Sequence, residues 1–192
     1  MRKAINSNTK AIIAVHLYGV PADMDELVEL CKDNQIVLIE DAAEAHGALY
    51  KDKPVGSIGT MSIFSFYGNK IITTGEGGMI TTDSKELCER LKFLRDHAMD
   101  SDRRYFHSEI GYNYRLTNLQ SAIGCAQLSR IDEILSKKNK ILLHYKSIAK
   151  KLDLPIQLNP SKQNCKSVPW LICMLFKDLK YSSSEIRKKL KK

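Results

Sequence analysis

Short apolar runs alternate with amphipathic segments along the first half of the chain. Four runs predict strands, at 11–17, 37–40, 61–66 and 79–82. Between the first two runs, a helix is expected to begin at an Asp23 cap and to continue to about Lys32. Its apolar stripe consists of Met24, Leu27, Leu30 and Cys31. Alternation of strands and helices is typical of a parallel α/β sheet.

The second half of the chain predicts helices joined by irregular segments. A loop is expected over 98–116, a linker over 154–167 and a strand over 168–176. Three helices each begin with a capping box, in which a cap residue is followed three positions later by Glu or Gln. These boxes are Asp83 with Glu86, Thr117 with Gln120, and Ser182 with Glu185. The first helix is expected to end near His97 and the second near Arg130, and a long helix follows to about Leu152.

Composition narrows the class of protein. The 192 residues carry a formal net charge of +8 and five cysteines without a CxxC pair, which indicates reduced thiols and no zinc site. A nucleic-acid module would rest on net charge alone, because no aromatic residues interleave with the lysine clusters. A basic balance also suits an anionic substrate such as a sugar diphosphate. Neither a membrane helix nor a secretory signal is predicted, so a cytoplasmic location is expected.

Three residues with candidate chemistry lie at the ends of predicted strands or just beyond them: Asp41 after the second strand, Ser65 at the end of the third, and Lys70 in the loop that follows. Open α/β sheets bind ligands at the carboxyl ends of their strands. A neutral lysine amine at such a site can attack a carbonyl and form a Schiff base. A carboxylate at the neighbouring strand end can hold a pyridine nitrogen protonated. On chemistry alone, a surface lysine and a capping aspartate explain the same pattern equally well.

Four sequence blocks sharpen this picture. They are VHLYG at 15–19 with PADMD at 21–25, IEDAAEAHG at 39–47, FSFYGNKIITTGEGG at 64–78 and GYNYRLTN at 111–118. Together they resemble the DegT/DnrJ/EryC1/StrS family of sugar aminotransferases that depend on pyridoxal 5'-phosphate (PLP), and within it the GDP-perosamine synthase-like subgroup.

The resemblance implies an α/β fold of the aspartate aminotransferase type (fold type I). Chains of this family are longer, so the resemblance implies a fragment with an incomplete large domain. Residues 1–130 would be part of the large PLP-binding domain. Residues 131–192 would be a linking helix and the start of the small C-terminal domain.

The same resemblance implies roles for five residues. Lys70 would form the Schiff base with PLP and later move the proton, and Asp41 would pair with the pyridine nitrogen. Ser65 would hold the cofactor phosphate. Asn113 would reach the phosphate from a partner subunit, so the site would need a homodimer. Glu44 would face the cofactor ring.

Four further residues have alternative interpretations. His16 and His46 lie in matching blocks and would line the substrate pocket, although a core histidine with satisfied hydrogen bonds explains each equally well. Arg115 would meet a substrate anion or form an ordinary surface ion pair. Trp170 resembles an aromatic residue of the smaller domain and is expected in a core.

The implied reaction is a transamination. An amino donor, L-glutamate by resemblance, would supply nitrogen that passes to a nucleotide-linked 4-keto-6-deoxy sugar. A sugar dehydratase with the same cofactor is a weaker alternative, because those enzymes typically replace the lysine with histidine. A truncated, non-catalytic remnant of such an enzyme is the alternative from a different class.

Overall fold

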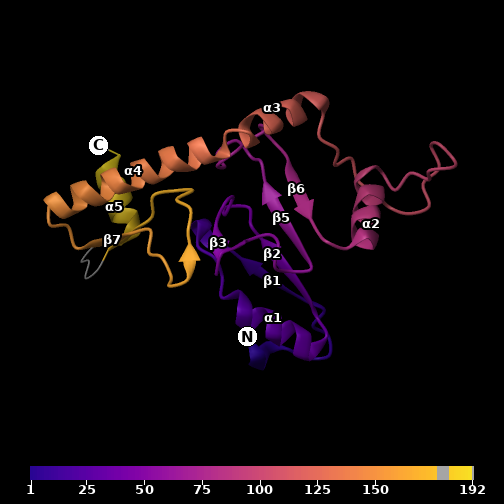
Figure 1. The fold of residues 1–192 in the computed structure, drawn as a ribbon, viewed down its shortest axis with the longest axis horizontal. Helices are drawn as coiled ribbons and strands as arrows, with labels where there is room; N and C mark the ends of the chain where they lie inside the picture. The colour runs from indigo at the N-terminus through magenta and orange to yellow at the C-terminus, as the bar shows by residue number, and fades with distance from the viewer. Residues whose placement is uncertain (177–181, 192) are drawn as a thin grey trace.

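The computed structural model describes residues 1–176 and 182–191. Its central sheet has the strand order β1-β2-β5-β6 (Figure 1). The strands are β1 (Ala11–Val15), β2 (Val37–Asp41), β5 (Met61–Ser65) and β6 (Gly78–Thr81). The first three are parallel, as expected, but β6 runs antiparallel to β5. The prediction of a parallel sheet is wrong there, because the chain returns from β5 through a loop and not through a crossover helix.

Helix α1 (Met24–Asn34) packs against β1 and β2. It buries all four residues of the predicted apolar stripe, so the predicted helix is confirmed. The side chain of Asp23 makes no capping hydrogen bond, and the helix ends at Gln35 in the left-handed region. Two short 3-10 helices, η1 (Arg2–Ala4) and η2 (Leu17–Gly19), flank β1 in the sequence.

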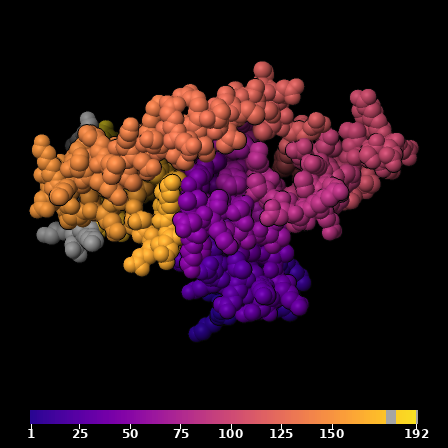
Figure 2. Space-filling model, viewed as in Figure 1, coloured from indigo at the N-terminus to yellow at the C-terminus, as the bar shows by residue number. Residues whose placement is uncertain are grey.

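Three helices follow the sheet. α2 (Lys85–Arg95) begins one residue later than predicted, because Ser84, and not Asp83, caps it by accepting the N–H of Leu87. The capping box of Thr117 and Gln120 is confirmed at the start of α3 (Asn118–Leu128), and α4 (Ile131–Lys151) is the long helix. Figures 1 and 2 show α2 and the loop after it projecting away from the sheet.

The last fifth of the chain differs most from the prediction. The expected linker contains β7 (Ile156–Leu158) and β8 (Cys165–Lys166), and the expected strand over 168–176 is limited to β9 (Met174–Phe176). β7 pairs with β9, whereas β8 joins the hairpin of β3 (Leu49–Tyr50) and β4 (Lys53–Pro54). The final helix α5 (Ser183–Leu190) has the predicted capping box. The segment around β8 therefore returns to the first half of the chain (Figure 2).

The hydrophobic core joins both halves of the sequence. It contains residues of α1, of the sheet and of the loops after β2 and β5, together with Val168 and Trp170 from the returning segment. Among the described residues, no helix is long and apolar enough to cross a membrane. All five cysteines are free thiols.

Gly19 is the closest point of contact with the returning segment. Its φ is +79°, and a Cβ built there would lie 2.1 Å from the Val168 carbonyl oxygen. We expect Gly19→Ala to lower the free energy of unfolding by on the order of 2–4 kcal/mol, through a clash added to backbone strain. Gly75→Ala is the matched control, because Gly75 has a similar φ of +82° with nothing within 4 Å. Equal thermal denaturation midpoints for the two variants would contradict the close packing at Gly19.

Candidate active site

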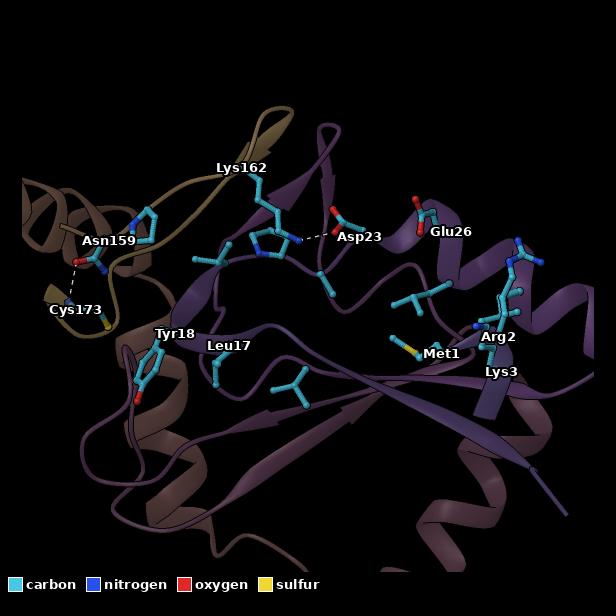
Figure 3. Close-up of a pocket in the computed structure, with 17 residues that line it drawn as sticks. Met1, Arg2, Lys3, Leu17, Tyr18, Asp23, Glu26, Asn159, Lys162 and Cys173 are labelled. Atoms are coloured by element: carbon cyan, nitrogen blue, oxygen red, sulfur yellow. Dashed lines mark hydrogen bonds and ion pairs between the residues drawn. The ribbon is translucent and has the colours of Figure 1, made fainter. Parts of the chain in front are cut away.

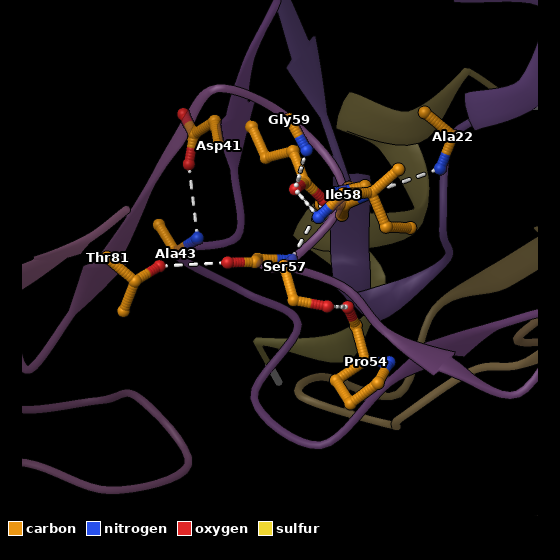
Figure 4. Close-up of polar contacts among 11 residues, drawn as sticks. Ala22, Asp41, Ala43, Pro54, Ser57, Ile58, Gly59 and Thr81 are labelled. Carbon is orange, nitrogen blue, oxygen red and sulfur yellow. Dashed lines mark hydrogen bonds and ion pairs between the residues drawn. The ribbon is translucent and has the colours of Figure 1, made fainter. Parts of the chain in front are cut away.

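The ends of two parallel strands place Asp41 and Ser65 at one edge of the sheet. Asp41 is the last residue of β2, and Ser65 is the last residue of β5. The Asp41 Oδ1 accepts the N–H of Ala43 at 3.1 Å, which fixes the carboxylate in the turn after the strand (Figure 4). The Ser65 Oγ accepts the N–H of Tyr67 at 3.3 Å in the same way. Both side chains therefore lie where ligands bind in open α/β sheets.

Lys70 lies in the loop between β5 and β6. Backbone hydrogen bonds close this loop at its base: Phe66 donates to Gly77 and accepts from Thr74. Only 12% of the Lys70 side chain is exposed, and its Nζ lies 3.9 Å from the Glu44 Oε1. Since Glu44 belongs to the turn that Asp41 begins, the lysine and both carboxylates share one region.

Glu44 connects this region to the segment after β1. Its Oε2 accepts the N–H of Tyr18 at 2.6 Å. Tyr18 has a φ of 53°, a left-handed conformation that is uncommon for a residue with a side chain and costs on the order of 1 kcal/mol. The ring of Tyr18 stacks on that of Trp170 at a centroid distance of 6.0 Å. Tyr18 thus contacts both Glu44, beside the lysine, and Trp170 from the last part of the chain.

A buried carboxylate of β2, that of Glu40, forms hydrogen bonds with the segment before β5. Glu40 is fully buried; its Oε1 accepts the N–H groups of Ile58 and Gly59, and its Oε2 accepts that of Gly56 (Figure 4). His16 Nε2 lies 3.0 Å from the same Oε2. Burial by itself raises the pKa of Glu40, but the hydrogen bonds from His16 and the three N–H groups outweigh it and lower that pKa.

His16 is a core residue in this structure. It is fully buried, and its Nδ1 accepts the N–H of Ala22 at 3.1 Å while its Nε2 faces Glu40. Both ring nitrogens therefore have protein partners. This is the geometry of the satisfied core histidine, and it leaves neither nitrogen for a substrate.

His46 is also buried, but its two ring nitrogens have no hydrogen-bond partner among the described residues. The ring lies against Phe64 and Phe66, with centroid distances of 5.4 and 6.1 Å. Burial, followed by the positive charge of Lys70, lowers the pKa of His46 to about 4, and the Ser65 backbone opposes this shift. His46 is consequently a neutral side chain next to the site at neutral pH.

Asn113 and Arg115 lie apart from this cluster. Both are exposed on the segment between α2 and α3, beside Asp96. The Arg115 Nη1 donates to the Asp96 Oδ2 at 3.0 Å, an exposed ion pair. Of the two roles expected for Arg115, the structure therefore shows the ordinary surface ion pair. The contact of Asn113 with a cofactor phosphate across a subunit boundary stays a prediction.

Sequence reasoning missed two contributors to the site. Trp170 was expected in a core, and it is in one, but its ring also lies over the Lys70 Nζ at 4.0 Å from the ring centroid. Glu40 was not singled out, although its position next to Asp41 in a strand places the two side chains on opposite faces. The alternation of side chains along the strand could therefore have indicated that Glu40 is a buried carboxylate.

A groove of about 920 Å³ lies elsewhere, between the end of β1, α1 and the segment around Lys162 (Figure 3). An ion pair of 2.7 Å between Lys162 and Asp23 crosses it. The groove touches Tyr18 but includes none of Asp41, Ser65 or Lys70. This groove is therefore not the candidate active site, because its lining is mainly apolar and lacks the lysine and carboxylates of the strand ends.

Comparison with known proteins decides the family. Residues 1–192 match the sequence pattern of the DegT/DnrJ/EryC1/StrS aminotransferase family. The chain belongs to this family. GDP-perosamine synthase of Escherichia coli O157:H7 is 43% identical over 175 residues, which are 91% of this chain and 47% of that protein. GDP-perosamine synthase of Caulobacter vibrioides is 51% identical over 141 residues, 73% of this chain and 38% of that protein.

A solved structure confirms the fold class. The crystal structure of S. venezuelae DesV in complex with a ketimine intermediate superposes with a TM-score of 0.86 at 34% identity, covering 99% of this chain and 50% of that one. The fold is therefore that of an incomplete fold type I domain. The chain spans about half the length of the curated relatives it matches. The cofactor of the family is PLP.

Proposed function

We propose that this chain carries the PLP-binding lysine of a sugar aminotransferase, which transfers an amino group to a nucleotide-linked 4-keto-6-deoxy sugar. The observation that supports this most directly is the placement of the Lys70 amine, which is largely buried and lies 3.9 Å from Glu44, in the turn that follows Asp41 at the end of β2. The relatives named GDP-perosamine synthase support a nucleotide-linked sugar as the substrate. A 4-keto-6-deoxy sugar is the proposed acceptor, and L-glutamate is the proposed amino donor. The proposed location of the enzyme is the cytoplasm.

The residues present fit the cofactor. Among the described residues, Asp41 Oδ2 has no partner, which leaves one carboxylate oxygen for a pyridine N–H. The Ser65 hydroxyl accepts one hydrogen bond and keeps its own hydrogen for a phosphate oxygen. When bound, PLP supplies an electron sink that stabilises negative charge at the carbon losing a proton. Lys70 Nζ would bind the cofactor carbonyl carbon and, once released, would move that proton as a general acid and base.

A homodimer is part of the proposal. Exposed aromatic and aliphatic side chains gather on the projecting loop after α2, where Tyr105, Ile110 and Tyr114 are each more than two-thirds exposed. A surface of this kind favours association with another protein surface. Asn113 lies on the same segment, so a second copy packed there would carry this amide to its neighbour's site.

Covalent mapping of PLP tests the proposal. We expect PLP to give a visible absorption band with the purified chain, and borohydride to fix the cofactor mass on the peptide that contains Lys70. Lys85, with 91% of its side chain exposed, is the internal reference for non-specific reaction. Labelling spread evenly over exposed lysines, or none at all, would favour the alternative of a non-catalytic remnant.

A further inference from the structure

The only tryptophan of the sequence lies against the amine of Lys70. The Lys70 Nζ is 4.0 Å from the centroid of the Trp170 ring, and Trp170 is 8% exposed. A cation within about 6 Å of an aromatic face is attracted by the ring quadrupole, most strongly when the contact is shielded from water. Within the described part of the chain, the indole ring face and the Glu44 carboxylate thus both lie close to this amine.

The orientation of the indole is fixed on several sides. Its Nε1–H donates to the Asn69 carbonyl at 2.9 Å, one residue before the lysine it covers. Its own carbonyl accepts from Lys138 Nζ of α4 at 3.1 Å. One ring face stacks on Tyr18, with an interplanar angle of 19°. The ring is therefore held in place before any ligand enters, as a positioning group must be.

The segment that carries Trp170 is itself anchored to the first half of the chain. β8 pairs with β3 at Leu49 and Tyr50, and the N–H of Val168 donates to the Gly19 carbonyl at 3.0 Å. Val168 and Trp170 are both part of the common core. A segment far away in sequence therefore covers the amine, which explains why so little of the Lys70 side chain is exposed.

We infer that Trp170 is a positioning residue for Lys70. Its ring face and the Glu44 carboxylate hold Nζ at the strand-end edge and shield it from solvent. The shielding follows from the geometry alone, whereas its use in presenting the amine to a carbonyl rests on the function proposed above. The inference predicts that the reactivity of this one lysine depends on the indole.

Reductive methylation with formaldehyde, with cyanoborohydride as the hydride donor, tests the shielding without PLP. We expect Trp170→Ala to raise the methylation rate of Lys70, relative to Lys85, on the order of five-fold, the factor equivalent to about 1 kcal/mol. Trp170→Phe keeps an aromatic face but loses the hydrogen bond to Asn69, so a smaller rise is expected. Rates are read for each lysine by peptide mass spectrometry. An unchanged ratio of Lys70 to Lys85 in both variants would overturn the inference.

A folding control and a second readout keep the test decisive. Cys31 is buried in the core, so its thiol stays unreactive while a variant is folded. If Cys31 becomes reactive in Trp170→Ala, that variant is not folded. The methylation ratio of Lys70 to Lys85 is then compared between Trp170→Phe and the native chain. Because Trp170 is the sole tryptophan, Lys70→Met is expected to shift its fluorescence, whereas Lys85→Met is not. No shift with Lys70→Met would show that the amine does not contact the ring.

These readouts separate the inference from the proposed function. Faster methylation and a fluorescence shift in a chain that fails to capture PLP would support the positioning role and count against the aminotransferase. Capture of PLP at Lys70 with an unchanged methylation ratio would do the reverse.

Discussion

Lys70→Ala is expected to abolish covalent capture of PLP by this chain. In the proposed function, the Lys70 amine would form the bond to the cofactor, and neither Glu44 nor Asp41 can replace a nitrogen nucleophile. We expect borohydride-trapped cofactor to fall by at least about a hundred-fold, to the background of exposed lysines. The measurement is the cofactor mass on each lysine-containing peptide, together with the visible absorption band.

Two variants separate chemistry from charge and from folding. Lys85→Ala removes an exposed lysine of α2 and should leave capture unchanged. Lys70→Arg keeps a cation beneath the Trp170 ring, but its guanidinium stays protonated and is not a nucleophile, so capture should be lost while the fold remains. Capture that persists in both Lys70 variants would move the site to another lysine and refute the assignment.

Local patterns predicted the elements that place the site. The apolar stripe of α1 and the capping box of α3 depend on spacing within a few residues, and both were confirmed. The strands that end at Asp41 and Ser65 were also expected within one residue. Strand-end chemistry could therefore be predicted, because the carboxyl ends of parallel strands share an edge whatever the rest of the chain does.

Long-range pairing could not be predicted from the same patterns. The two-residue strand β8 has no periodic signal of its own, and it forms only because Tyr50 and Leu49 offer an edge far away in sequence. The position of Trp170 over Lys70 depends on that pairing, so the sequence indicated a core residue and not its contact. The antiparallel direction of β6 was not predicted for a related reason, because hydrophobic periodicity gives no strand direction.

Glu40 is the buried group whose removal should most affect stability. In Glu40→Gln, the oxygen that serves Ile58 and Gly59 can be kept, but the amide NH₂ then replaces the Oε2 and faces two donors, Gly56 N–H and His16. His16 cannot turn this around, because its Nδ1 already accepts from a backbone N–H. Leaving buried donors unpaired in this way costs about 3 kcal/mol, which corresponds to a denaturation midpoint roughly 6–12 °C lower.

The pH dependence of that difference identifies the carboxylate as its cause. The folded-state pKa of Glu40 is lowered from the ordinary value of 4.5, so its contribution to stability is fully present above pH 4.5 and is lost as the pH falls through the lower folded value. The gap between native chain and Glu40→Gln should therefore be constant near neutrality and shrink in acid. Glu133→Gln is the control, because its pKa is lowered to about 2 by exposed partners, Arg130 first, and solvent screens that pair. The difference in free energy of unfolding between the two chains is measured by urea denaturation. If it stays constant down to about pH 3, Glu40 acts by its shape and not by its charge, and another group must stabilise the strand end at Asp41.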